Sequence, residues 1–414
     1  MLKALGALTV SLAIVAAPAE YARRVDAVRT IPGFVALWDF VTREPGPAGR
    51  FAAHQAPGDS RDFHLDAANY VRDYWAEGRP ATYDDFPLLG EGPFGEAVQF
   101  RDEGDPSFRP VLLVPRTRLH DSGLDVKGPN RSVSMVAWVR YETGNHAIAG
   151  IWHEGTDLRE ARHTPALRVE PGMRQYALFA GLAANSGASA AHVSENGASS
   201  FGDKYARNLS VTPERLSSGW NLVGFTFDND ADVVTSYIDD VASEYWIDQP
   251  ASHPFFKWPA AGWQQAYWRG LPGLQDGEDP AFPEAQFYTP PETSPILTEL
   301  LVDGDDERVE VRTYDFTRVR VTRRRTPGGT AWHDVNRELV GLKVNPFWFG
   351  HDLHAPATLE AGGPFTIGRV IHTSRSVGVV GAIGGVAVFG RALTRAEMAT
   401  LAAIAKAPPL PTSP

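Results

Sequence analysis

The chain has 414 residues, and its 43% hydrophobic content supplies a sizeable core, which excludes wholesale disorder. Its net charge of −11 argues against a nucleic-acid backbone as partner, although a local cluster of basic residues would still suit an acidic glycan. The absence of cysteine excludes disulfides, zinc–thiolate sites and cysteine catalysis. The 39 Gly and 32 Pro suit many short strands joined by tight turns.

Residues 1–19 have the features of a secretory signal peptide. Lys3 precedes an apolar run over residues 4–17, and residues 17–19 read A-P-A, a cleavage-site pattern. We therefore expect cleavage after Ala19 and a protein that is secreted or held in the periplasm or cell envelope. The alternative is a short N-terminal helix packed on the domain. No other segment approaches transmembrane length, so we predict no membrane span.

The next part of the chain predicts strands joined by loops. Runs of β-branched and aromatic residues bounded by turn residues mark the strand segments 34–40, 92–100, 132–139, 147–152 and 174–182, and a hairpin over 220–241. Trp138 is expected to be buried in its strand. The long segment between the first two strands reads as loop, with a short helix at 66–75.

A large insertion follows, from about residue 243 to 363. It carries several Trp residues and a hairpin pattern in which strands at 309–313 and 318–321 precede a Pro-Gly-Gly turn at 327–329. So long a segment without structure of its own would be unusual in a compact domain. We therefore expect it to fold as a strand-containing lobe.

The C-terminal region reads as strand, loop, strand and capped helix. Strands are predicted at 366–371 and 383–389. Thr394 and Glu397 form a T-x-x-E capping box, which predicts a short helix ending before Pro408. Residues 407–414 are expected to be a disordered tail.

Several of these segments together resemble the laminin G-like, concanavalin A-like lectin/glucanase jelly-roll superfamily. The matching phrases are FVALWDF (34–40), GPFGEAVQF (92–100), SVSMVAWV (132–139), the hairpin 220–241, and a closing phrase made of Gly381, Ile383, Val386, Val388, Phe389, Arg391, Leu393 and Glu397. The resemblance implies an all-β, concanavalin A-like jelly-roll sandwich of two antiparallel sheets. It would form a single domain over 20–406, with the insertion lobe at about 243–363 and a short C-terminal helix.

The segment after strand 174–182 carries the first candidates for chemistry. His192 could accept a proton, Tyr205 could deliver one, and an arginine such as Arg207 could bind a uronate carboxylate, which are the parts of polysaccharide β-elimination. Glu195 with a second carboxylate could instead serve glycoside hydrolysis, or hold the His192 ring in orientation. The alternative is a polar loop with solvated charges.

Aromatic and basic residues elsewhere are candidates for substrate binding. Trp offers a broad apolar face for a sugar ring. Alternation places the side chains of Trp152 and His153 on opposite faces of their strand. Arg375, in the loop after strand 366–371, could clamp a carboxylate or sulfate, and its convergence with His192 and Tyr205 in one pocket would favour cleavage. The candidates are Trp152, His153, Trp258, Trp263, Trp268, His372 and Arg375. The alternatives are core packing for the rings and local ion pairs for the arginine.

Metal signals are weak. Residues 228–232 read D-N-D-A-D, but they occupy an expected hairpin tip, where Asp and Asn are ordinary turn residues. Many laminin G-like domains have an acidic pair in the last strand, where this chain has Gly384 and Gly385. We therefore predict no metal ligands and no firm cofactor, with calcium as the one ion left open.

The sequence supports three functional hypotheses. The first is a secreted jelly-roll protein that binds extracellular polysaccharide. The second is a polysaccharide-cleaving enzyme, a lyase before a glycoside hydrolase, because the chain is one elaborated domain without a separate catalytic module. The third is an adhesion or structural protein of the cell envelope that uses the lobe as a protein interface. The oligomeric state and the identity of the glycan are not predicted.

Overall fold

A computed structural model gives the structure of residues 18–45, 50–59, 61–143, 146–153, 173–180, 187–195, 197, 210–212, 215–231, 233–242, 246–252, 294–314, 317–343, 347–348, 352–371 and 377–411. The chain divides into two compact units. The second unit comprises Glu244–Gly350 with the short segment Asp203–Arg207, and the first unit holds the rest. The insertion was expected to run to about residue 363, whereas the structure assigns residues from His351 onward to the first unit.

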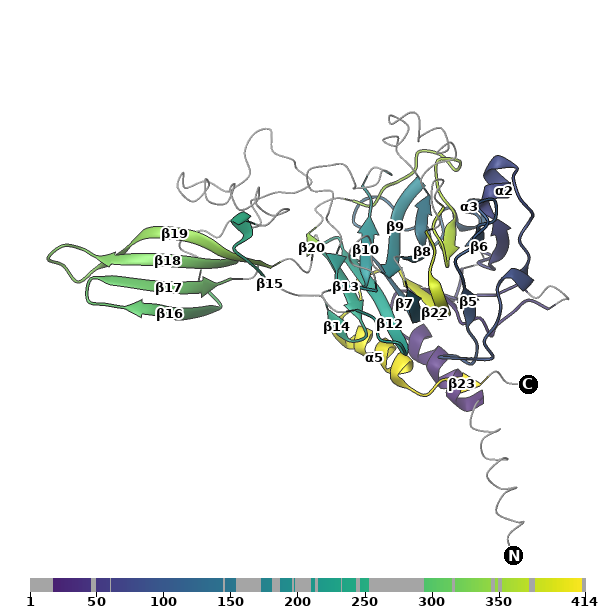
Figure 1. The fold of residues 1–414 in the computed structure, drawn as a ribbon, viewed down its shortest axis with the longest axis horizontal. Helices are drawn as coiled ribbons and strands as arrows, with labels where there is room; N and C mark the ends of the chain where they lie inside the picture. The colour runs from purple at the N-terminus through teal and green to yellow at the C-terminus, as the bar shows by residue number, and fades with distance from the viewer. Residues whose placement is uncertain are drawn as a thin grey trace, which may run out of the picture. The chain divides into compact units, whose positions relative to one another are not determined.

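The first unit contains two antiparallel sheets (Figure 1). The strands of the first sheet follow the order β14-β13-β12-β7-β22-β1-β2, with β5 beside β22. Their bounds are β14 Val241–Ala242, β13 Val233–Ile238, β12 Trp220–Asp228, β7 Val133–Thr143, β22 Val380–Phe389, β1 Phe34–Trp38, β2 His54–Gln55 and β5 Val98–Phe100.

The second sheet has the order β11-β10-β9-β8-β21-β6-β3. Its strands are β11 Ser210–Val211, β10 Ala190–Val193, β9 Met173–Ala180, β8 His146–His153, β21 Phe365–Ile367, β6 Pro110–Val114 and β3 Asp66–Asn69. A short ladder of β4 Glu91–Gly92 with β23 Leu410–Pro411 lies apart from both sheets.

Aromatic side chains join the two sheets into a sandwich. Trp38 of β1 stacks on Phe365 of β21, with ring centroids 5.1 Å apart. Tyr176 of β9 meets Phe225 of β12 at 6.5 Å. Burial of such large apolar side chains is the main source of stability in a sandwich core. The predicted all-β jelly-roll sandwich is confirmed.

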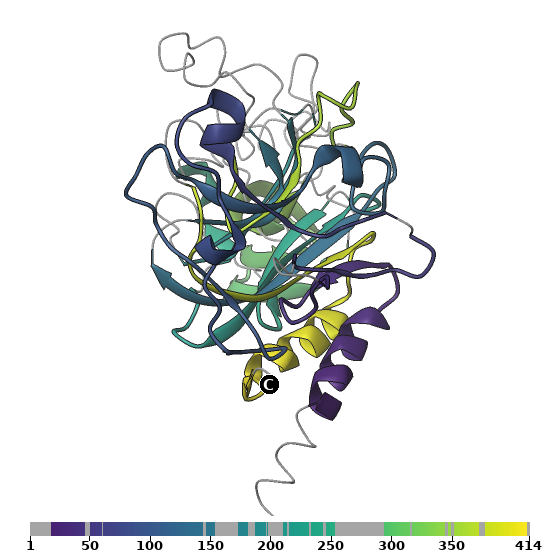
Figure 2. The ribbon, with the colours of Figure 1, turned by 90° about the vertical axis from the view of Figure 1, so that its right-hand side faces the viewer.

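Two helices pack side by side against the first sheet (Figure 2). They are the helix over residues 18–29 and α5, Arg395–Lys406. Val25 and Val28 of the first helix share a core cluster with Met398 and Leu401 of α5 and with Trp138. The predicted capping box of Thr394 and Glu397 is present, and the predicted C-terminal helix is confirmed.

Trp138 is fully buried, as expected, and it fixes α5 on the sheet. Its indole Nε1 donates a hydrogen bond to the backbone oxygen of Leu401 at 3.1 Å. Its ring meets Phe94 edge-on at 4.9 Å. None of the helices that the structure describes is long and apolar enough to span a membrane.

Some local predictions differ from the structure. The helix predicted at 66–75 forms only over α2, Tyr70–Trp75, because Asp66–Asn69 pairs with β6 as strand β3 and Asn69 then caps the helix through the backbone N–H of Val71. Two other short helices are α3, Arg116–Leu119, and the 3₁₀ turn η1, Tyr83–Asp85.

The ends of the C-terminal elements also differ from the predictions. Strand β21 stops at Ile367, because the φ of Gly368 is +86°, outside the range of a strand. Glycine is needed at this position, since a Cβ would collide with the Phe100 ring. In the tail that was expected to be disordered, Leu410 and Pro411 pair with β4.

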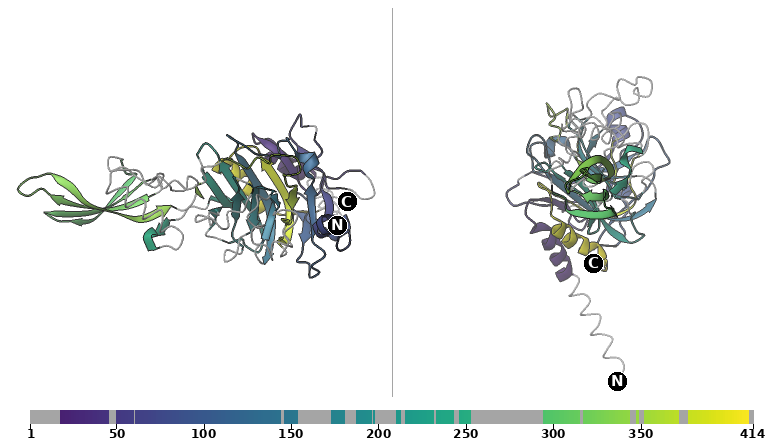
Figure 3. Two further views of the ribbon diagram at one scale, coloured as in Figure 1. Left: turned by 90° about the horizontal axis from the view of Figure 1, so that it is seen from above. Right: turned by 90° about the vertical axis from the view of Figure 1, so that its left-hand side faces the viewer.

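The second unit contains a twisted antiparallel sheet of the order β15-β19-β18-β17-β16 (Figure 3). Its strands are β15 Trp246–Asp248, β19 Trp332–Lys343, β18 Thr317–Arg325, β17 Glu307–Thr313 and β16 Leu297–Asp303, and η5 Pro250–Ser252 and β20 Phe347–Trp348 also belong to this unit. The predicted hairpin of β17 and β18 is present. One face buries Val319, Val321, Leu339 and Leu342.

Candidate functional site

His192 lies on the face of the second sheet that points away from the sandwich interior. Tyr176 points inward to Phe225, so alternation directs its neighbour Ala177 outward, and His192 is paired with Ala177. The His192 ring packs edge-on against Trp152 at 4.9 Å and against Phe179 at 5.6 Å. The exposed fraction of His192 is 2% and that of Trp152 is 5%.

Arg174 completes this cluster and sets its electrostatics. Its guanidinium lies 5.7 Å from the centre of the Trp152 ring and donates to the backbone oxygen of Gly197 at 3.2 Å. Burial, and next the charge of Arg174, lower the pKa of His192 to about 3. The His192 ring is therefore neutral at pH 7 and a weak base.

Trp152 and His153 contact different neighbours, and their placement on opposite faces of the strand stays a prediction. His153 does not join the Trp152 cluster but meets the ring of Tyr74 at 4.8 Å. It is 1% exposed, and burial followed by the charge of Arg174 lowers its pKa to about 3. Both side chains lie against protein, and their role in substrate binding stays a prediction.

The structure brings together only part of the predicted site. Glu195 is exposed just after β10, and the neighbouring Ser194 accepts a backbone hydrogen bond from His354 at 2.7 Å. Seven other candidates lie outside the described residues: Tyr205, Arg207, Trp258, Trp263, Trp268, His372 and Arg375. Their roles stay predictions.

A cleft in the first unit has the lining of a ligand site, and none of the candidates from the sequence belongs to it. One cavity of about 200 Å³ lies between the 3₁₀ turn η1, strand β5 and the loop that leads to β6. Its aromatic side chains are Phe86, Phe100 and Phe108. Its polar and charged side chains are Arg79, Asp84, Asp85, Gln99, Arg101, Glu103 and Arg369.

A second cavity, of about 350 Å³, shares a wall with the first. Asp84, Phe86 and Pro87 line both, so the two cavities adjoin along η1 and the residues that follow it. The second cavity is otherwise lined by Arg43, Phe51, Tyr83 and Leu88. We call these adjoining cavities the paired cleft.

An arginine covers an aromatic ring in each half of the paired cleft. The Arg79 guanidinium lies 3.7 Å from the centre of the Phe108 ring, and the Arg43 guanidinium lies 4.5 Å from that of Phe51. Arg79 is also held by Asp85 through two hydrogen bonds, at 2.9 and 2.5 Å. These bonds lower the pKa of Asp85 and keep its carboxylate charged. Aromatic faces beside fixed charged groups are a usual lining for polar ligands.

Little in the sequence points to this cleft. Its residues come from loops and strand ends far apart in the chain, from Arg43 to Arg369, and most lie in the segment that reads only as loop. The clustering of Tyr83, Asp84 and Phe86 beside two prolines was the one local hint.

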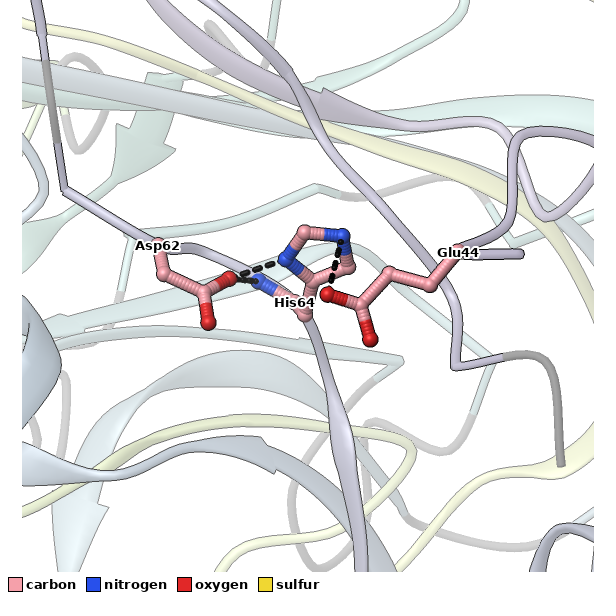
Figure 4. Close-up of side chains that lie close together, drawn as sticks. All are labelled: Glu44, Asp62 and His64. Atoms are coloured by element: carbon pink, nitrogen blue, oxygen red, sulfur yellow. Dashed lines mark hydrogen bonds and ion pairs between the residues drawn. The ribbon is translucent and has the colours of Figure 1, made fainter. Parts of the chain in front are cut away.

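Two groups of side chains in the first unit have donor atoms close enough to hold a metal ion. One is Glu44, Asp62 and His64, shown in Figure 4, and the other is His120, Asp121 and Asp125. In the first, His64 Nε2 lies 3.0 Å from Glu44, and His64 Nδ1 hydrogen-bonds to Asp62.

Basic side chains already bind the carboxylates of both groups. Arg50 donates to Glu44 at 2.5 and 2.7 Å, which lowers the pKa of that carboxyl. In the second group, Arg116 and Lys127 bind Asp125 at 2.7 Å each. Such partners make both groups ion-pair networks, and calcium binding stays open.

No family model matches this chain, and no curated protein matches it. Among solved structures, the chain is similar to a Trypanosoma rangeli sialidase in complex with 2,3-difluoro-KDN, with 10% identity and a TM-score of 0.36 over 93% of this chain and 38% of that one. It is also similar to domain 4 of an extracellular arabinanase from Geobacillus stearothermophilus in complex with arabinotriose, with 9% identity and a TM-score of 0.38 over 89% and 98%.

A third similar structure is that of botulinum neurotoxin type C, with 8% identity and a TM-score of 0.33 over 89% of this chain and 50% of that one. The chain spans about two fifths of the length of the Trypanosoma rangeli sialidase structures. Similarity at these scores decides neither the family nor the activity of this protein.

Proposed function

We propose that this protein is a secreted, laminin G-like jelly-roll protein that binds a saccharide in the paired cleft. The main support for this proposal is the lining of that cleft, where Phe86 and Leu88 supply apolar surface next to the charged groups of Arg43 and Asp84. A sugar presents apolar C–H faces and hydroxyl groups together, so it needs both kinds of surface within one site.

Asp84 is the best residue for a test, because it is exposed and lines both cavities. We expect the folded protein to be retarded in affinity electrophoresis through gels that contain its polysaccharide, with plant, algal and microbial polymers screened in turn. Asp84→Ala weakens this retardation. Asp102→Ala is the matched control, because Asp102 is also exposed but does not line the cleft.

Absence of retardation in every polymer contradicts the saccharide-binding function. Equal loss in Asp84→Ala and Asp102→Ala contradicts the placement of the ligand in the paired cleft.

Binding has more support than cleavage. The lyase hypothesis used His192, Tyr205 and Arg375, of which only His192 belongs to the described residues. A buried ring with a pKa of about 3 is poorly matched to proton abstraction near neutral pH.

A second function, protein contact through the second unit, has its own supporting observation. Every residue of β16 is exposed, including Leu297 at 62% and Leu300 at 50%, and β16 ends the sheet order in the part of the chain that is described. Exposed apolar edge strands usually pair with another chain. Ile296 and Leu297 are the two most exposed large apolar side chains among the described residues, so a second copy is the best complement to this edge.

Light scattering during size-exclusion chromatography tests this contact. We expect a dimer that Leu297→Lys combined with Leu300→Lys converts to a monomer. Asn336→Lys, at an exposed position of the same sheet, leaves the dimer intact. A monomeric wild-type protein contradicts the contact.

A further inference from the structure

Each half of the paired cleft contains an arginine that forms no ion pair with any carboxylate of the described chain. In the larger cavity this residue is Arg43, and in the smaller cavity it is Arg101. Arg79 differs from both, because Asp85 binds its guanidinium. Arg43 and Arg101 are thus two cations of the cleft that a ligand can still neutralise.

Arg43 is the better placed of the two. Its side chain is half-buried, and the Phe51 ring holds its guanidinium at 4.5 Å. Burial lowers the pKa of Arg43, while the more distant charge of Glu96 acts in the opposite direction. An arginine guanidinium stays protonated in proteins, so Arg43 is a cation that is only partly compensated.

The rest of the larger cavity offers little other charge. Phe51, Tyr83, Phe86 and Leu88 supply its apolar and aromatic surface, and Asp84 is its one acidic side chain. The Tyr83 hydroxyl already donates to the backbone oxygen of Leu65 at 2.9 Å. A planar guanidinium in such surroundings matches a carboxylate through two parallel hydrogen bonds, better than it matches a neutral hydroxyl.

Building on the saccharide-binding function, we propose that the ligand is an acidic saccharide whose hexuronate carboxylates bind Arg43 in one half of the cleft and Arg101 in the other. The adjoining cavities place neighbouring sugar units on either side of the wall formed by Asp84 and Phe86. Asp84 can accept hydrogen bonds from sugar hydroxyls at the shared wall, while its charge directs the acidic groups of the ligand into the two halves.

Isothermal titration calorimetry with one charged and one uncharged saccharide of equal length tests this inference. We use tetragalacturonate and a neutral galactotetraose at low salt. We expect the acidic saccharide to bind the wild type about a hundredfold more tightly, since each of its two carboxylates gains a hydrogen-bonded arginine worth about tenfold in affinity. Arg43→Gln and Arg101→Gln each lower the affinity for the acidic saccharide by about tenfold and leave the affinity for the neutral saccharide unchanged.

Two control variants make the result specific, and a second test variant guards against a folding failure. Arg43→Lys keeps the positive charge but loses the planar guanidinium that forms two parallel hydrogen bonds. Its affinity for the acidic saccharide therefore lies between those of Arg43→Gln and the wild type. Arg131→Gln removes an exposed arginine that does not line the cleft and leaves both affinities unchanged. Arg101 is exposed, so Arg101→Gln keeps the test available if Arg43→Gln fails to fold.

Equal affinity for the acidic and neutral saccharides, lost in Asp84→Ala, overturns the acidic ligand and leaves the saccharide-binding function in place. Tighter binding of a sulfated tetrasaccharide overturns the carboxylate assignment. Failure of every saccharide to bind overturns the function as well.

Discussion

The guanidinium of Arg79 lies 3.7 Å from the centre of the Phe108 ring, while Asp85 holds the same guanidinium by two hydrogen bonds. This arrangement fixes one wall of the smaller cavity before any ligand arrives. A wall that is already ordered loses little conformational entropy when a ligand binds.

Removal of this wall should weaken binding. Arg79→Ala leaves the Phe108 ring uncovered, and we expect saccharide affinity to fall about two- to fivefold, the range that a surface cation–π contact spans. Titration with the best polymer fragment measures the change. Arg61→Ala, another exposed arginine but outside the cleft lining, is the control. Unchanged affinity in Arg79→Ala would show that this wall is not part of the site.

His192→Ala should lower the free energy of unfolding by about 2–4 kcal/mol, because it leaves a cavity between the Trp152 and Phe179 rings. Urea unfolding followed by tryptophan fluorescence measures this loss. The exposed His333 provides the control, and His333→Ala should stay within about 0.5 kcal/mol of the wild type. A His192→Ala protein with unchanged stability but lost polysaccharide cleavage would instead support the catalytic hypothesis.

Acid should destabilise the fold before the carboxylates titrate. The pKa values of His153 and His192 are lowered to about 3 in the folded protein, below the ordinary histidine value near 6.5, so the unfolded chain binds more protons between these values. Stability is therefore full above about pH 6.5 and is lost as pH falls toward 3. Each histidine contributes about 1.4 kcal/mol per pH unit within this window.

Urea unfolding at intervals from pH 7 to pH 4.5 measures that slope. His192→Gln should reduce it by about half, because one of the two buried histidines then no longer titrates. A slope that is unchanged in this variant would place the pH dependence on other groups.

The capping box of α5 gives a prediction with a control in the same helix. Thr394 accepts the backbone N–H of Glu397 at 3.3 Å, and Glu397 accepts the backbone N–H of Thr394 at 2.8 Å. Thr394→Ala should cost about 1 kcal/mol of unfolding free energy. Thr400→Ala removes only a hydroxyl bonded to the backbone oxygen of Ala396 within the helix, so thermal unfolding should show little change. Equal effects of the two variants would exclude a capping contribution.

Local sequence signals predicted the frame of the fold well. Thr394 and Glu397 are three residues apart, and Trp138 lies within an apolar strand, so spacing and composition alone indicate a cap and a buried ring. The prediction of a helix over 66–75 was wrong for residues 66–69, because the pairing of β3 with β6 is a tertiary contact that overrides local periodicity.

The site was less predictable for the same reason. His192 and Trp152 were separate candidates in the sequence, and they meet in the structure, but no spacing reveals that both rings are buried. The paired cleft joins Arg43, Asp84 and Arg101 across long stretches of chain, and no periodic pattern connects such positions.

Hydrogen–deuterium exchange with and without saturating saccharide tests the central claim, that the ligand occupies the paired cleft. We expect slower exchange in peptides that cover residues 83–88 and 98–101, and a smaller change in Asp84→Ala at the same saccharide concentration. Protection confined to β8, β9 and β10, or to the second unit, would contradict this account.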